Sequence, residues 1–128
     1  MLSLTLATYL VSDHDAAMTF FVDALGFSVR EDETRPNGSR WVVVGPEDGP
    51  GLRLAVAAAT DPLGRQAGDG VGFFLRTDDF ASQYARMVAA GVRFLEEPRY
   101  EAYGTVVVFA DPDGQRWDLI QPAAPAAL

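Results

Sequence analysis

The chain contains an internal repeat, and this repeat restricts the possible fold more than any other feature of the sequence. Asp13 precedes Gly26 by thirteen residues, and Asp78 precedes Gly91 by the same number. Around each pair, an apolar strand-like run is followed by a helix-like segment, a glycine and further strand-like runs. A repeat of about sixty residues in so short a chain indicates two copies of one supersecondary unit, each covering the apolar face of the other. We expect the ligand to bind between the two copies.

The first copy predicts a strand, a helix and three further strands. Residues 2–11 are apolar and partly alternating, as expected for a strand covered on both faces. Ser12 or Asp13 provides a helix cap, and apolar residues at spacings of three and four predict a helix that ends at Gly26. Turns rich in proline, asparagine and glycine then separate predicted strands at 27–33, 40–45 and 52–58.

The second copy follows after a linker without periodicity. It predicts a strand at 71–77, a helix capped by Asp79 that ends at Gly91, and strands at 92–95, 103–110 and 116–121. The expected organisation is a single domain, since 128 residues suffice for one core. Its parts are module one at 1–58, the linker at 59–70, module two at 71–122 and a tail at 123–128.

The composition disfavours several classes of partner. Ten basic and eighteen acidic residues give a formal charge of −8, which disfavours a nucleic-acid backbone and favours attraction of cationic small molecules. The chain has no cysteine, so it has no disulfide and no thiolate metal site. No apolar run approaches the roughly 20 residues of a membrane helix, and residues 1–11 lack a basic leader. We therefore expect a cytoplasmic protein with no nucleic-acid or membrane partner.

Several short segments share their order and spacing with one known superfamily. They are residues 11–13 with 20–27, residues 89–92 with Phe94, and residues 111–114 followed by 118–121. Through them the chain resembles, over nearly its whole length, the vicinal oxygen chelate superfamily, also called the glyoxalase, bleomycin-resistance and dioxygenase superfamily. The resemblance implies an α+β fold in which two βαβββ modules form a cup-shaped mixed sheet with helices outside. It also implies a homodimer.

In metal-using members of this superfamily, four side chains that point into the cup hold a divalent ion. The resemblance places these positions at Leu6, about Ala55, Gly72 and Asp118. Catalytic ions of this kind take about three protein ligands from histidine and carboxylate, and three of the four residues here have no donor. The single histidine, His14, lies beside the helix cap and is expected to be solvated. We expect no metal and no other cofactor.

The neighbours of these four positions are the candidate ligand-binding residues. Side chains alternate along a strand, so residues two positions away lie on the same face of the sheet. This assignment depends on the register, because a shift of one residue would exchange the two faces. The residues nominated in this way are Thr8, Arg53, Phe74, Arg76, Arg116 and Ile120. Trp41 and Tyr103 border strands near the expected mouth of the cup and are candidate stacking walls. Trp117 alternates away from Asp118 and is expected to pack on a helix.

Asp118 is the clearest candidate for catalysis. In a partly apolar cup its pKa is expected to rise, which suits a general acid or base. The alternative is a structural carboxylate paired with Arg116, Arg53 or Arg76. Arginines that converge without being neutralised instead suit a carboxylate or phosphate on the ligand.

These residues are consistent with two functions. The preferred hypothesis is a metal-free small-molecule-binding protein of the glyoxalase/bleomycin-resistance type, which sequesters an antibiotic or natural product in a homodimer and thereby confers antibiotic resistance. The alternative is a metal-independent isomerase, lyase or cyclase. In that case Asp118 acts as acid or base on a substrate that the arginines hold.

Overall fold

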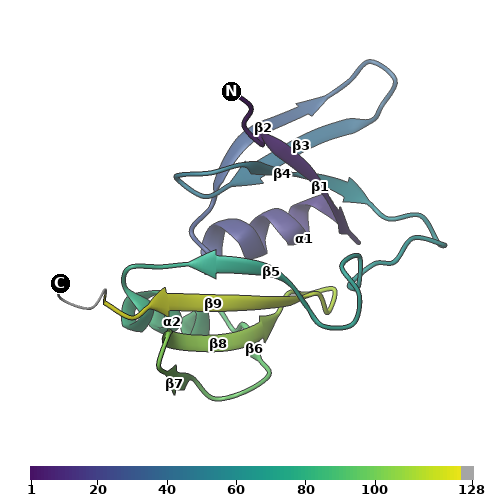
Figure 1. The fold of residues 1–128 in the computed structure, drawn as a ribbon. Helices are drawn as coiled ribbons and strands as arrows, with labels where there is room; N and C mark the ends of the chain where they lie inside the picture. Colours follow the sequence, from purple (N-terminus) through teal and green to yellow (C-terminus); the bar gives the residue numbers. More distant parts are fainter. Residues whose placement is uncertain (125–128) are drawn as a thin grey trace.

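Two mixed β-sheets with helices beside them make up the protein, as a computed structural model that describes residues 1–124 shows (Figure 1). The first half of the chain forms β1 (Leu6–Val11), α1 (His14–Thr19), the π-helical turn η1 (Phe20–Ala24), β2 (Ser28–Thr34), β3 (Arg40–Gly45) and β4 (Gly51–Val56). The second half forms β5 (Val71–Arg76), α2 (Phe80–Ala89), β6 (Arg93–Phe94), β7 (Arg99–Glu101), β8 (Gly104–Ala110) and β9 (Arg116–Pro122). The α+β fold with two βαβββ units is confirmed, with β7 as an additional short strand. Of the predicted tail, residues 125–128 lie outside the described part.

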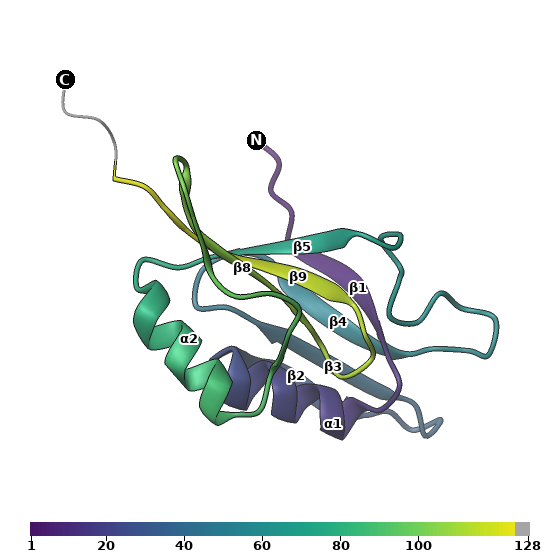
Figure 2. The same ribbon diagram turned by 90° about the horizontal axis from the view of Figure 1, so that it is seen from below.

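Each sheet has the same plan, with a parallel pair at one edge. The strand orders are β1-β4-β3-β2 and β5-β9-β8-β6, and β7 pairs with β8. β1 runs parallel to β4 and β5 runs parallel to β9, whereas the other neighbours are antiparallel. Figure 2 shows α1 and α2 next to each other along one side of the molecule, with β1, β5 and β9 towards the other. No helix among the described residues is long and apolar enough to cross a membrane.

Both helices begin at the predicted aspartates, and the first widens near its end. The side chain of Asp13 accepts from the Ala16 N–H and that of Asp79 accepts from the Ser82 N–H, as helix caps do. After Thr19 the helix continues as the π-helical η1, a widening that the sequence pattern did not predict, and Gly26 follows its end. The main-chain carbonyls at the end of η1 accept hydrogen bonds from Gln83 and Arg86 on α2, which stabilise this looser turn from outside.

Three strand predictions are corrected. β1 begins at Leu6 instead of residue 2, because its partner β4 begins at Gly51, directly opposite Leu6, and Leu2 remains 99% exposed. β6 is restricted to residues 93–94 of the predicted 92–95. β7 was not predicted, because three residues are too few to show an alternating pattern.

The two sheets share a single hydrophobic core. It contains Tyr9 and Leu54 from the first sheet, Phe109 and Trp117 from the second, and Phe21 from η1. The ring of Trp117 lies 5.7 Å from that of Phe21, centroid to centroid, so the prediction that Trp117 packs on a helix is confirmed. The core therefore joins the two modules within one chain.

A buried polar link crosses this core. The Tyr9 hydroxyl on β1 donates to the Asp111 carboxylate in the β8–β9 turn and accepts from Trp117 Nε1 at 2.9 Å. The linker at 59–70 has neither helix nor strand, but it is also attached. Gln66 accepts from the Leu10 N–H at 2.6 Å, and its own N–H donates to Gln115 at 3.1 Å. Hydrogen bonds therefore hold the two modules together in addition to apolar packing.

Candidate ligand-binding site

Each sheet has one face in the core and one face away from it, and the outer faces carry the candidate residues. On β1 and β4 the core residues are Tyr9, Val11 and Leu54, so alternation turns Thr8 and Arg53 to the other side. We call this side the first outer face; it consists of Leu6, Thr8, Leu10, Trp41, Val43, Gly51, Arg53 and Ala55. The second outer face consists of Gly72, Phe74, Arg76, Val106, Val108, Arg116, Asp118 and Ile120.

The first outer face brings Thr8, Arg53 and Trp41 together. Thr8 lies directly opposite Arg53 on the parallel β1–β4 pair. The guanidinium carbon of Arg53 lies 5.3 Å from the centroid of the Trp41 ring, and that of Arg35 lies 4.8 Å from it. Both are cation–π distances. Nε of Arg53 is buried and has no hydrogen-bond partner among residues 1–124.

The second outer face is centred on Asp118. This residue lies opposite Phe74 on β5 and Val108 on β8. Its Oδ1 atom is buried and accepts no hydrogen bond from the described residues. Burial raises the pKa of Asp118 above its ordinary value of 3.8; the positive charge of Arg99 opposes this shift, and the negative charge of Glu96 adds to it. The group therefore favours its protonated form more than a solvated aspartate does.

The charged neighbours of Asp118 are not the predicted ones. Within residues 1–124 Asp118 forms no ion pair with Arg53, Arg76 or Arg116. Instead Arg99 Nε donates to Glu96 at 2.9 Å, and Glu96 also accepts from the main-chain N–H of Val108 at 3.0 Å. Sequence reasoning missed Glu96 and Arg99 because they belong to β7 and the segment before it, where no periodicity is visible.

The predicted site residues divide between the two faces. Thr8, Phe74, Arg76, Tyr103 and Arg116 are exposed, whereas Trp41, Arg53 and Asp118 are half-buried. Because each outer face lies on the side of its sheet away from the shared core, one chain does not bring Arg53 and Asp118 together. In the single chain Thr8 and Phe74 are exposed on these faces, whereas Val43 and Val106 are buried. Tyr103 lies in the β7–β8 turn, at the end of the second outer face.

The residues at the predicted metal positions do not suit a divalent ion. Leu6 and Ala55 have aliphatic side chains and Gly72 has none, so Asp118 is the only donor of the four. Within residues 1–124 there is no cluster of three or more histidine, cysteine, aspartate or glutamate residues that could hold a metal. His14 is not simply solvated as expected: it is half-buried, and its Nε2 lies 2.9 Å from the Leu54 carbonyl oxygen.

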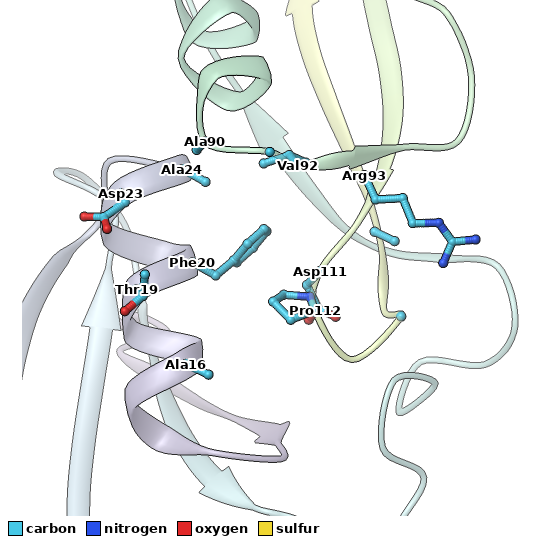
Figure 3. Close-up of a pocket in the computed structure, with 13 residues that line it drawn as sticks. Ala16, Thr19, Phe20, Asp23, Ala24, Ala90, Val92, Arg93, Asp111 and Pro112 are labelled. Atoms are coloured by element: carbon cyan, nitrogen blue, oxygen red, sulfur yellow. The ribbon is translucent and has the colours of Figure 1, made fainter.

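A separate cavity of about 510 Å³ lies between η1, the α2–β6 connection and the β8–β9 turn (Figure 3). The Phe20 ring points into it, and the side chains of Asp23 and Arg93 extend away from that ring. Small and apolar residues, including Ala16, Ala24 and Pro112, form most of its walls, and Thr19 and Asp111 also line it. Sequence reasoning missed this cavity because alanines from three distant segments create it.

Two repeated βαβββ units with open outer faces define the class of protein. The family model of the Glyoxalase/Bleomycin resistance protein/Dioxygenase superfamily matches residues 3–119. The chain belongs to this superfamily, as its sequence motifs predicted.

Individual relatives agree with this assignment. A protein of Shewanella frigidimarina (strain NCIMB 400) is 43% identical over 117 residues, which cover 87% of each chain. The crystal structure of TnmS3, an antibiotic binding protein from Streptomyces sp. CB03234, superposes with a TM-score of 0.78 at 31% identity, covering 96% of this chain and 98% of that one. The crystal structure of UcmS2 superposes with a TM-score of 0.79 at 29% identity, covering 94% of this chain and 98% of that one.

Proposed function

We propose that this protein binds a small-molecule natural product without a metal ion and sequesters it. The observation that carries the proposal is the chemistry of the outer faces. Three of the four positions where metal-using relatives hold an ion have no donor atom, while Arg53 and Asp118 beside them keep buried polar atoms without partners. Buried polar atoms are nearly always satisfied in proteins, so these two atoms are suited to hydrogen bonds with a ligand.

The likeness to an antibiotic binding protein supports the same proposal. TnmS3 is described in those words, and its identity to this chain extends over almost the whole of both chains. The aromatic side chains on the outer faces, Trp41 on the first and Phe74 on the second, suit stacking against a planar ligand.

We further propose that the protein acts as a homodimer in which a second copy covers the outer faces. Large apolar side chains remain exposed there and in the adjoining β7–β8 hairpin: Phe74 is 68%, Tyr100 84% and Tyr103 56% exposed. A twofold dimer that places the first face of each copy on the second face of the other encloses two equivalent cavities.

Calorimetric titration tests the binding proposal. Bleomycin-type compounds and planar natural products are titrated into the purified protein, with and without EDTA. We expect at least one planar compound to bind with Kd in the micromolar range, unchanged by EDTA, because the ligand contacts side chains instead of an ion. Failure of every compound to bind better than millimolar would contradict sequestration, and a stoichiometric metal in elemental analysis would contradict the metal-free site.

One observation favours a second function, that of a metal-independent isomerase, lyase or cyclase. The raised pKa of Asp118 and its unpartnered Oδ1 atom suit proton transfer. For any substrate that the protein converts, the Asp118→Asn variant is expected to lose about 10²-fold or more in kcat, as removal of a general acid or base does. Full activity of that variant would eliminate Asp118 as the catalytic group.

A further inference from the structure

A second arginine, Arg30, reaches the first outer face from a β-bulge. The pairing of β2 with β3 shifts register between Val29 and Glu31, so Arg30 is the extra residue. Its guanidinium fills the space above Gly45 and Gly51, which have no side chains. If these glycines carried a Cβ atom, the one on Gly45 would lie 2.5 Å from Arg30 Cζ and the one on Gly51 would lie 3.2 Å from Arg30 Nη1. The two glycines therefore leave the space that Arg30 occupies.

The Arg30 guanidinium and the Arg53 position are neighbours on this face. Gly51 lies beside the Arg30 guanidinium and precedes Arg53 by two residues on β4. Positions 51 and 53 therefore lie on the same face of the strand, about 7 Å apart along it. Thr8 is directly opposite Arg53 and exposes its hydroxyl. Trp41 lies beyond Arg53, within cation–π distance of it. Along this face the order is therefore Arg30, Arg53 with Thr8, and then the Trp41 ring.

Neither of these two arginines is neutralised by the described residues. Arg30 Nη2 donates to the uncharged carbonyls of Pro46 and Gly49, at 2.7 and 2.9 Å. Arg53 Nε has no hydrogen-bond partner in the part of the chain that the structure describes. The ion pairs within residues 1–124 involve other arginines, namely Arg35, Arg40 and Arg99. Glu31, which pairs with Val43 from the neighbouring strand β2, accepts from Trp41 Nε1 at 2.9 Å.

We propose that Arg30, Arg53 and Thr8 form a subsite for an oxyanion, and that the ligand is a planar aromatic molecule with a carboxylate. The carboxylate would contact the two guanidinium groups, and the aromatic rings would extend along the face towards Trp41. Guanidinium groups bind carboxylates through paired charge-assisted hydrogen bonds, which suits both arginines. The net charge of −8 does not oppose this, because salt screens distant charges beyond about 8–10 Å, while contacts within the subsite are screened little. The inference rests on the proposed small-molecule-binding function.

Two naphthalene probes that differ in one group test the subsite. 2-Naphthoate carries the carboxylate, and 2-naphthamide has the same planar rings without the charge. In calorimetric titrations of the wild-type protein at 150 mM salt, 2-naphthoate is expected to bind roughly tenfold or more tightly than the amide. Arg30→Gln, Arg53→Gln and Thr8→Val should each reduce that preference. Arg65→Gln changes the net charge equally at an exposed linker residue and should preserve it.

The outcomes separate this inference from the proposed function. Equal binding of the two probes would overturn the oxyanion subsite and leave small-molecule binding intact, whereas binding of neither better than millimolar would count against both. An equal loss of preference in Arg65→Gln would show a long-range charge effect and would also overturn the subsite. Thermal unfolding checks that each variant folds. If Arg53→Gln does not fold, Arg53→Lys replaces it, because lysine keeps the charge but lacks the planar guanidinium. An unchanged preference for 2-naphthoate over 2-naphthamide in both Arg53→Lys and Thr8→Val would refute the oxyanion subsite.

Discussion

Tyr9 connects two elements that are distant in sequence and is completely enclosed by the core. Burial, and then the charge of Asp111, raises the pKa of Tyr9, so its hydroxyl stays protonated and donates to Asp111. Burial also raises the pKa of Asp111, an effect that hydrogen bonds from Tyr9 and from the Gln115 and Asp113 N–H groups oppose. The buried polar atoms of Tyr9, Asp111 and Trp117 thus depend on one another for their hydrogen bonds.

Replacement of Tyr9 by phenylalanine should therefore destabilise the protein. The change keeps the ring but leaves the Trp117 N–H and an Asp111 oxygen in the core without partners. We expect the free energy of unfolding to fall by about 1–3 kcal/mol, measured by urea denaturation. The control is Thr60→Val, which removes a hydroxyl at an exposed position of the linker and should change the free energy of unfolding by less than about 0.5 kcal/mol. Equal effects of the two changes would mean that the buried link adds no stability.

The raised pKa of Asp118 predicts a pH dependence of stability. An acid whose pKa is higher in the folded state than in the unfolded state binds protons more readily when the protein is folded. Its contribution to the free energy of unfolding is therefore favourable at low pH, and this contribution is lost as pH rises from 3.8 through the folded pKa. Asp118→Asn cannot ionise and avoids this loss. The Tm of Asp118→Asn relative to wild type should therefore increase between about pH 4 and pH 7. A constant difference in Tm across this range would argue that the folded pKa is not raised.

At the scale of elements, α2 completes the helix of the other module. Arg86 donates to the carbonyls of Val22 and Asp23, at 3.0 and 2.9 Å, and Gln83 donates to that of Ala24 at 3.1 Å. These carbonyls lie at the end of η1, where a helix leaves its acceptors unpaired. Side chains of module two therefore complete the main-chain hydrogen bonding of module one.

Arg86→Ala should loosen η1 more than the rest of the chain. It removes two charge-assisted hydrogen bonds, so amide hydrogen exchange in residues 20–27 should accelerate, and the free energy of unfolding should fall by roughly 1–3 kcal/mol. Arg93→Ala is the matched control, because Arg93 is exposed and forms no ion pair with the described residues. Unchanged exchange across η1 in Arg86→Ala would refute this role.

The same elements explain which parts of the fold and site were predictable. Helix caps identified Asp13 and Asp79 because capping depends on local sequence alone. The candidate faces of β1, β4 and β9 came from the superfamily resemblance, which placed Leu6, Ala55 and Asp118, and from alternation, which extended each face to its neighbours. Arg30 escaped prediction because the bulge in β2 breaks the period of two on which a face assignment depends. Arg99 escaped it because β7 is positioned by its pairing with β8, a contact that no local pattern encodes.

At the scale of the whole molecule, the proposed dimer predicts a mass and a variant that changes it. Light scattering after gel filtration should give twice the chain mass of 13.8 kDa. Phe74→Gln removes an exposed aromatic side chain from the second outer face and should shift the protein towards the monomer at micromolar concentration. Val88→Gln, on the exposed side of α2, should leave the mass unchanged. A wild-type mass of one chain would contradict the dimer.

The single core shared by both modules also bears on how such a chain arises. A chain with one βαβββ unit would expose Tyr9, Phe21 and Leu54 to water, so it would be stable only when paired with a second copy. That pairing weakens on dilution, since it depends on the concentration of free chains. Joining two copies through a linker such as 59–70 fixes their local concentration near the millimolar range. Duplication and fusion thus make folding independent of how much protein a cell contains.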